Sequence, residues 1–329
     1  MPDEMRNRLV NTLTKSALYE HSRKKNLPIP KSISEVSIER TKERMLESMA
    51  PSTGSPALDR FIKGFVPGHL YTMTGDENVG KTSLACNFAI NVAVQGKKVL
   101  YFALEPENTV VDYLASVRFD KYFDDLLPEE LSFDDEKIHV YGKQDVRTVD
   151  ELVAIIESLT RYDLIIIDHI GYFVTDLRGN IQEQSNIIKK LAGLAKAKRC
   201  AIMMIAHLRK RDKTTKKKRT IMSDDIAGSA AFKQDSTEVL IMTRDYEDND
   251  SDDLVYQNTG YLHVAKTKCG PNGKIRVEFQ TKKAKIYMEG DSWIDTSMNL
   301  EGRAEGSEVD FDDTGDGYPL LDGEWNPEG

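Results

Sequence analysis

The chain contains little cysteine and no long apolar run. Its three cysteines, Cys86, Cys200 and Cys269, are odd in number and widely spaced among 329 residues, which argues against a disulfide framework and a zinc site. We interpret them as buried thiols of a reducing compartment. No apolar stretch reaches the roughly eighteen residues that a membrane-spanning helix needs. The first residues also lack an apolar signal core, so we predict a cytoplasmic protein.

Charge is concentrated in two segments of the chain. Residues 301–329 hold ten acids and one base, and their net charge of −9 equals that of the whole chain. The rest of the chain is therefore neutral on balance, although residues 209–219 hold eight bases and one acid. Such a basic run is either a solvated surface segment or a binding site for a polyanion.

The pattern of apolar residues and chain breakers divides the sequence into three regions. Residues 1–51 form a polar, basic arm with a helix expected at 38–49. In residues 52–288 strands and helices alternate, which predicts an α/β domain whose mostly parallel sheet has helices on both faces and an antiparallel extension at one edge. Residues 289–329 lack periodicity and predict an acidic, disordered tail. The expected strands are 70–74, 98–103, 137–141, 163–168, 200–206, 238–243, 260–266, 274–280 and 285–288, with long charged connections at 208–223 and 245–257.

The most specific chemical signal is at residues 75–82. They follow the pattern of a glycine, four residues and Gly-Lys-Thr, between an expected strand and an expected helix. Backbone N–H groups at such a helix N-terminus bind phosphate oxygens. We therefore predict binding of ATP, or of another NTP or dNTP, with Mg²⁺ held by Thr82. The expected nucleotide-binding residues are Gly75, Asp76, Glu77, Asn78, Val79, Gly80, Lys81, Thr82 and Ser83.

Polar residues end three other expected strands. Asp168 is a candidate ligand for Mg²⁺, and Glu105 is a candidate base for the attacking water. His207 is a candidate contact for the terminal phosphate. Each has a plainer alternative: a capping aspartate, a solvated glutamate and a structural histidine. Ligands gather at the C-terminal ends of parallel strands, which favours the functional interpretation.

Further cations are candidates for contacts with DNA and with a neighbouring nucleotide site. Arg244, Lys266 and Lys268 lie at expected strand ends, where a cation can stabilise transition-state charge, often from an adjacent subunit. Taken alone, they are also ordinary surface bases. The basic run contains no aromatic residue, so it favours phosphate contacts over base stacking. Its expected DNA-binding residues are Arg209, Lys210, Arg211, Lys213, Lys216 and Lys217.

Together these motifs resemble the hexameric replicative DNA helicases of the DnaB and Twinkle type, and most of all the helicase half of phage helicase–primases. The resemblance covers about residues 52–288. Besides the phosphate loop, it rests on residues 59–68, 104–105, 165–170, 205–209, 225–235 and 266–273.

The resemblance implies a RecA-like P-loop NTPase fold and an ATP-dependent replicative DNA helicase, consistent with a phage protein in a bacterial host. It implies a ring, usually a hexamer, that moves 5′→3′ on single-stranded DNA and unwinds forked DNA. Catalytic roles fall on Lys81, Glu105 and His207 and, across a subunit interface, on the three cations Arg244, Lys266 and Lys268. It also places Gly228 and Ser229 near DNA.

The sequence departs from the family pattern at several positions. Lys268 stands where the family usually has an arginine, and lysine lacks the bidentate fork of a guanidinium. Asp76 and Glu77 place carboxylates in the phosphate loop, and Ala227 stands where many members have a DNA-contacting arginine. Two alternatives therefore stay open: a RecA- or RadA-type recombinase that forms filaments, and a nucleotide-binding scaffold with weak hydrolysis.

The two ends of the chain have hypotheses of their own. The N-terminal arm is a candidate contact for a neighbouring subunit or a loader. The acidic tail either keeps the chain soluble or docks on a polymerase, a primase or a single-stranded-DNA-binding protein through Phe311, Tyr318 and Trp325.

Overall fold

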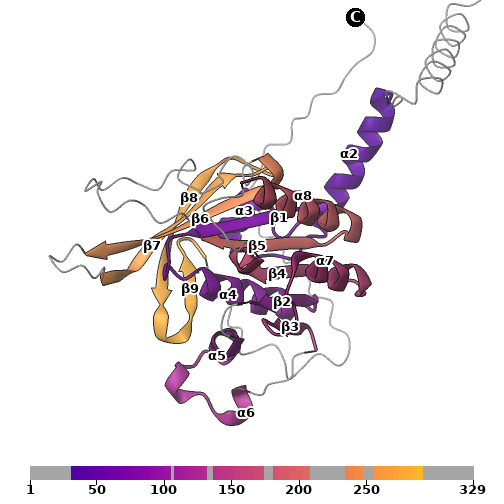
Figure 1. Ribbon diagram of the computed structural model, residues 1–329. Helices are drawn as coiled ribbons and strands as arrows, with labels where there is room; N and C mark the ends of the chain where they lie inside the picture. Colours follow the sequence, from indigo (N-terminus) through magenta and orange to yellow (C-terminus); the bar gives the residue numbers. More distant parts are fainter. Residues whose placement is uncertain are drawn as a thin grey trace, which may run out of the picture. The chain divides into compact units, whose positions relative to one another are not determined.

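The computed structural model of the chain describes residues 31–104, 107–131, 136–173, 181–207, 234–247 and 255–291 (Figure 1). For residues 181–184, 207, 247 and 255 it describes the backbone only. The expectations for most of the N-terminal arm and for the acidic tail lie outside these ranges and stay predictions. No helix in the described part is both long and apolar enough to cross a membrane.

A mixed sheet of nine strands forms the centre of the described domain, in the order β3-β2-β4-β5-β1-β6-β7-β8-β9 (Figure 1). Every strand expected from the sequence is present. The strands are β1 (Leu70–Gly75), β2 (Val99–Ala103), β3 (Ile138–Gly142), β4 (Leu164–Asp168), β5 (Ala201–His207), β6 (Glu238–Glu247), β7 (Val255–Lys266), β8 (Gly273–Gln280) and β9 (Lys285–Met288).

The sheet is parallel from β3 to β6 and antiparallel from β6 to β9. Parallel strands need long crossovers, which helices supply, whereas short turns return β7 to β8 and β8 to β9. This confirms the predicted antiparallel extension. One boundary was wrong: β6 and β7 continue into residues 245–257, predicted as a connection. Cross-strand pairing of Tyr246 with Tyr256 extends the hairpin there.

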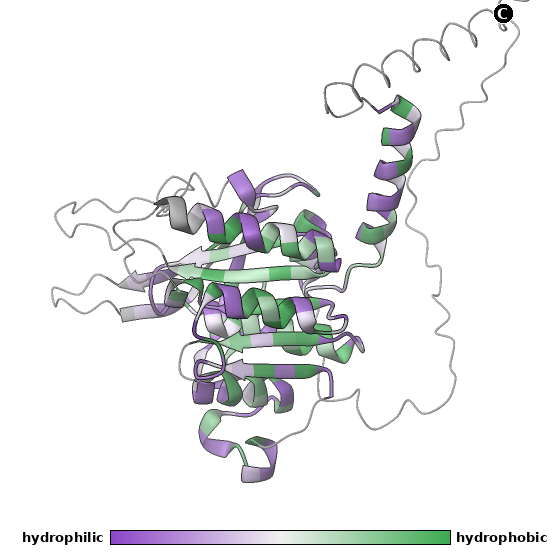
Figure 2. Cartoon of the chain, turned by 45° about the vertical axis from the view of Figure 1, so that its right-hand side comes forward, coloured by the Kyte–Doolittle hydropathy of each residue, from purple (hydrophilic) through white to green (hydrophobic). Residues whose placement is uncertain are grey.

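Helices cover both faces of the parallel strands. α4 and α5 pack on one face, and α7 and α8 pack on the other. Alternate residues of β2 divide between the faces, since Tyr101 joins the α4 side and Leu100 and Phe102 the α8 side. Figure 2 shows the resulting hydrophobic bands along the central strands. The helices are α2 (Ile33–Ser48), α3 (Pro56–Ile62), α4 (Lys81–Val94), α5 (Glu107–Phe119), α6 (Pro128–Leu131), α7 (Val149–Ser158) and α8 (Ile181–Lys198), with 3-10 turns η1 (Phe123–Asp125), η2 (Ile170–Phe173) and η4 (Thr281–Lys283).

The helix expected at 38–49 begins earlier, at Ile33. Ser32 caps it, because the Ser32 hydroxyl accepts the Glu35 N–H and the Glu35 carboxylate accepts the Ser32 N–H. This reciprocal capping box satisfies two N–H groups that the first turn leaves unpaired. The serine and glutamate are visible in the sequence at the required spacing, so the helix start was predictable and was missed.

Candidate nucleotide site

The C-terminal ends of the parallel strands gather predicted site residues at one edge of the sheet. Gly75 of β1 pairs with His207 of β5, and Ala103 of β2 pairs with Asp168 of β4. The Leu104 N–H donates to the Asp168 carbonyl oxygen at 2.7 Å. The phosphate loop, Asp168 and the backbone of His207 therefore share the edge at which ligands of open parallel sheets bind.

The phosphate loop requires glycine at two places. A Cβ on Gly75 would lie 2.4 Å from the carbonyl oxygen of Met242 on the adjacent strand β6. Gly80 has a φ of +97° and stands before the first residue of α4. A Cβ there would meet the Phe279 ring at 3.1 Å. Strand β6 thus leaves no space for a side chain at Gly75, and Phe279 of β8 makes a tight contact at Gly80.

Lys81 stands in the first turn of α4 with a buried side chain. Its Nζ donates to the carbonyl oxygen of Gly75 at 3.1 Å and to that of Asp76 at 2.5 Å. An ammonium held by the carbonyls of the loop is positioned to meet an anion that the loop binds. The first turn of α4 contains no acidic residue, so its N–H groups and helix dipole also favour an anion. Thr82 and Ser83, in the same turn, are half-buried.

Asp168 is held at the end of β4 by a tyrosine from the adjacent strand. The Tyr101 hydroxyl donates to Oδ2 of Asp168 at 2.9 Å, and both side chains are buried. Burial, followed by the charge of Asp168, raises the pKa of Tyr101 well above its usual value, so the phenol stays a donor. The sequence gives no indication of this role for Tyr101, because a tyrosine in an apolar strand carries no functional signal.

One cationic and two aromatic side chains from strands β6, β7 and β8 border the loop. The Tyr256 hydroxyl donates to the Glu77 carbonyl oxygen at 3.3 Å. The Arg244 guanidinium lies 4.6 Å from the centre of the Phe279 ring and 5.8 Å from that of Tyr256. Arg244 also donates to the Gln257 carbonyl oxygen. The predicted cation Arg244 thus lies on the phosphate-loop side of its own chain. It contacts two aromatic residues, Phe279 and Tyr256, that no sequence motif marks.

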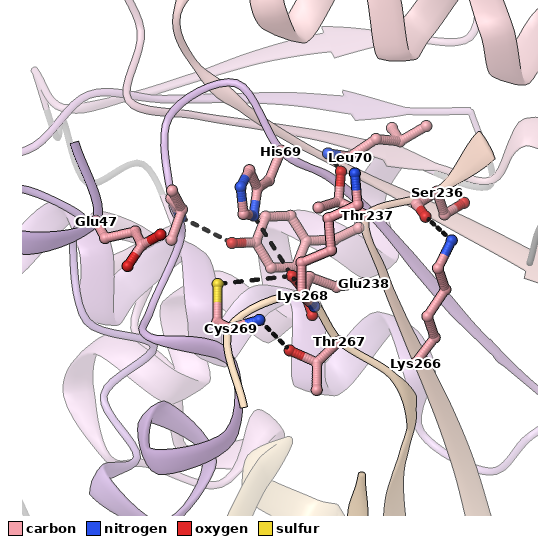
Figure 3. Close-up of polar contacts among 12 residues, drawn as sticks. Glu47, His69, Leu70, Ser236, Thr237, Glu238, Lys266, Thr267, Lys268 and Cys269 are labelled. Atoms are coloured by element: carbon pink, nitrogen blue, oxygen red, sulfur yellow. Dashed lines mark hydrogen bonds and ion pairs between the residues drawn. The ribbon is translucent and has the colours of Figure 1, made fainter. Parts of the chain in front are cut away.

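Lys266 and Lys268 lie at the opposite edge of the sheet. Lys266 pairs with Val239, near the start of β6, and its Nζ donates to the Ser236 carbonyl oxygen at 2.6 Å. Figure 3 shows Lys266 beside Ser236 and Lys268 next to Glu238, which pairs with Tyr71 near the start of β1. At about 3.3 Å per residue, the ends of β1 are about 17 Å apart. The two lysines therefore do not share an edge with the phosphate loop of their own chain.

Several predicted site residues cannot be placed. Glu105 lies outside the described residues, as does the side chain of His207. The same holds for the DNA-binding candidates Arg209, Lys210, Arg211, Lys213, Lys216, Lys217, Gly228 and Ser229. Their roles stay predictions.

The described residues fit a nucleoside triphosphate with Mg²⁺. The loop is closely packed at its glycines, the first turn of α4 offers N–H groups, and Lys81 supplies a positive charge. Thr82 and the buried Asp168 offer the hard oxygen ligands that Mg²⁺ prefers. Glu77 is exposed and Asp76 is half-buried. The bound nucleotide would supply the phosphoanhydride bond for hydrolysis.

A phosphate loop after one parallel strand and a buried aspartate at the end of another are the features of a P-loop domain. Residues 51–288 match the family described as DnaB-like helicase C terminal domain. The chain belongs to this family.

Known proteins of similar sequence include replicative helicases. The chain is 26% identical over 258 residues to the replicative DNA helicase DnaB of Mycoplasma genitalium, covering 70% of this chain and 54% of that protein. It is 27% identical over 285 residues to the replicative DNA helicase DnaC of Bacillus subtilis, covering 80% and 58%. The DNA repair protein RadA of Listeria monocytogenes is 26% identical over 163 residues, covering only 48% and 32%. The chain thus spans about half the length of the DnaB proteins that it matches.

Two solved structures share the fold. One, described as an ATPase domain, superposes with a TM-score of 0.63 at 18% identity, over 78% of this chain and 98% of that one. A DnaB-like replicative helicase, studied with its interactions with primase, superposes with a TM-score of 0.62 at 18% identity, over 78% and 67%. At these identities the likeness establishes the RecA-like architecture.

Proposed function

We propose that this protein is an ATP-dependent replicative DNA helicase. The observation that carries the proposal is the family match over residues 51–288, within which the phosphate loop, Lys81 and Asp168 meet at one sheet edge. In this role Lys81 binds the terminal phosphates, and Thr82 and Asp168 hold Mg²⁺. Glu105 activates water, and His207 contacts the terminal phosphate.

The position of Lys266 and Lys268, away from the phosphate loop of their own chain, supports a ring in which neighbouring subunits share nucleotide sites. Lys266 and Lys268 stand at the edge away from their own phosphate loop, so any nucleotide that they contact belongs to another subunit. Burial and the charge of Lys268 lower the pKa of Lys266, yet its Nζ still donates to Ser236. In a closed ring each subunit would offer these lysines to a neighbour's nucleotide. We infer that the ring is a hexamer.

The basic run at residues 209–219 is the proposed DNA contact. It directly follows β5, whose last residue pairs with Gly75 of the phosphate loop. A structural change at the nucleotide edge can therefore reach the DNA contact through the end of β5. Because it holds eight bases, its binding to single-stranded DNA should weaken steeply as salt rises.

The test measures ATP hydrolysis with and without single-stranded DNA, together with unwinding of a fork that has a 5′ tail. We expect DNA to stimulate hydrolysis and the fork to open. Both activities should be lost in Lys81→Ala and kept in Lys189→Ala, which removes an exposed lysine on α8. Hydrolysis that ignores DNA, with a closed fork, would refute the helicase.

Native mass and electron microscopy separate the alternatives. Closed hexameric rings support the helicase. Filaments on DNA with strand exchange would support a recombinase, an alternative suggested by the partial similarity to RadA. Tight nucleotide binding without turnover would support a scaffold. Deleting residues 300–329 should leave hydrolysis unchanged, and loss of binding to a polymerase, primase or single-stranded-DNA-binding protein would assign the tail to docking.

A further inference from the structure

Three residues that are distant in sequence converge at the edge of the sheet opposite the phosphate loop. His69 immediately precedes β1, Glu238 is the first residue of β6, and Cys269 follows the end of β7. Figure 3 shows the imidazole, the carboxylate and the thiol turned toward one another. One donor atom from each residue lies within 4.8 Å of the other two. The nucleotide site uses none of them.

The spacing of the donor atoms matches that of a small tetrahedral ion. Nδ1 of His69 lies 3.4 Å from Oε1 of Glu238, and Sγ of Cys269 lies 3.8 Å from the same oxygen. Around a tetrahedral zinc ion, ordinary bond lengths place a nitrogen and an oxygen about 3.3 Å apart and a sulfur and an oxygen about 3.6 Å apart. Two of the three separations therefore already agree with coordination to within about 0.2 Å.

Polar atoms in this cluster are buried without partners in the described part of the chain. Glu238 is fully buried, and its Oε2 accepts no hydrogen bond. Nδ1 of His69 is likewise buried without a hydrogen bond. Oε1 of Glu238 accepts only weakly, from the Lys268 N–H at 3.3 Å and from the Cys269 thiol. A buried carboxylate with an unsatisfied oxygen is costly unless a cation meets it.

We propose that His69, Glu238 and Cys269 bind one zinc ion. A protonated His69 would offset the charge of Glu238, but it would leave Oε2 of Glu238 without a hydrogen bond and the Cys269 thiol with only a weak contact at 3.8 Å. A zinc ion uses all three donors at once and accepts this mixture of nitrogen, oxygen and sulfur, whereas Mg²⁺ and Ca²⁺ prefer oxygen alone. Three protein ligands leave the fourth position to water.

The zinc ion would join three segments of the sheet at one point. It would tie the starts of β1 and β6 to the turn after β7, which carries Lys268. Burial, then the charges of Glu238 and Glu47, raises the pKa of the Cys269 thiol to about 12, but a bound metal ion deprotonates its thiol ligand outright. Because the cluster lies at the edge of the sheet opposite the nucleotide site, we assign the ion a structural role: it would order the turn that carries Lys268.

The test uses the tag-free, full-length chain, stripped with a chelator and then titrated with zinc and with cobalt. Excess Mg²⁺ is present to fill the proposed metal site at Thr82 and Asp168. We expect one zinc ion per chain and a higher midpoint of thermal unfolding. Cobalt should give a thiolate charge-transfer band in the near ultraviolet and the visible bands of a tetrahedral ion.

Matched variants assign the ligands. Cys269→Ala should weaken zinc binding about 100-fold or more, since loss of even an outer-shell partner costs 10- to 100-fold. Cys200→Ala, which removes a buried thiol outside the cluster, should bind zinc as the parent chain does. Glu238→Gln keeps the shape of the side chain and should also weaken binding. If Glu238→Gln fails to fold, the cobalt spectrum of the parent chain decides. Absence of stoichiometric zinc, absence of the thiolate band, or equal binding by the two cysteine variants would each overturn the proposal.

Discussion

The hydrogen bond between Tyr101 and Asp168 offers a sharp test of how the site is built. Tyr101→Phe deletes one hydroxyl and leaves the ring, so it opens no large cavity in the core. The bond is 2.9 Å long and both partners are buried, so water cannot readily replace it. A hydrogen bond to a charged group contributes about 1.5–3 kcal/mol, and we expect a loss of folding free energy in that range.

A double-mutant cycle isolates this pair from other contacts of Asp168. In the Asp168→Asn background the acceptor is neutral, and a neutral hydrogen bond contributes only about 0.5–1.5 kcal/mol. Removing the hydroxyl should therefore cost about 1–1.5 kcal/mol less in that background than in the parent chain. By itself, Tyr101→Phe should raise the Mg²⁺ concentration needed for half-maximal hydrolysis, because the Asp168 carboxylate loses the donor that orients it.

Urea unfolding at pH 7 and at fixed protein concentration measures the stabilities, since subunit assembly makes stability depend on concentration. Tyr162→Phe is the matched control: Tyr162 is half-buried against the His139 ring, and we expect its loss to change stability by less than about 0.5 kcal/mol. A loss below about 0.5 kcal/mol for Tyr101→Phe, or equal losses in both backgrounds, would refute the reasoning.

Two further predictions concern the glycine contact and acid stability. Gly75→Ala places a Cβ 2.4 Å from a β6 carbonyl oxygen and should lower the free energy of unfolding by about 1–3 kcal/mol. Calorimetry should show that this variant no longer binds nucleotide. The control Gly193→Ala, in open space on α8, should be neutral or stabilising. Burial alone would raise the pKa of Asp120, but Lys285 at 2.8 Å and Lys283 at 3.3 Å lower it below 3.8. Its stabilisation is present above pH 3.8 and is lost as pH falls through the lower folded value, so Asp120→Asn should flatten acid unfolding there; an unchanged pH profile would contradict this.

Most of the fold could be predicted because its signals are local. The apolar strands, the turns after β7 and β8 and the glycine-rich loop are each contained in about ten residues. Alternation with helices then dictates the parallel part of the sheet. The errors have local causes too: Ser32 and Glu35 were not recognised as a capping box, and the pairing of Tyr246 with Tyr256 overrode a charged, loop-like sequence.

The site was less predictable where it depends on distant partners. Gly75, Lys81 and Asp168 carry sequence patterns that indicate their chemistry. Tyr101 and Tyr256 carry none, because their contacts come from the order of strands in the sheet. Strand direction likewise placed Arg244 on the phosphate-loop side and Lys266 at the opposite edge, although both end expected strands.

By itself the sequence determined a nucleotide-binding α/β domain and its resemblance to replicative helicases, because a phosphate loop is a contiguous motif whose backbone does the binding. By spacing alone the three cysteines argue against a zinc site, because zinc motifs are recognised in a sequence by short spacings. Only the tertiary structure brought His69, Glu238 and Cys269 together. They lie at the ends of strands paired across the sheet, and no spacing along the chain encodes that pairing.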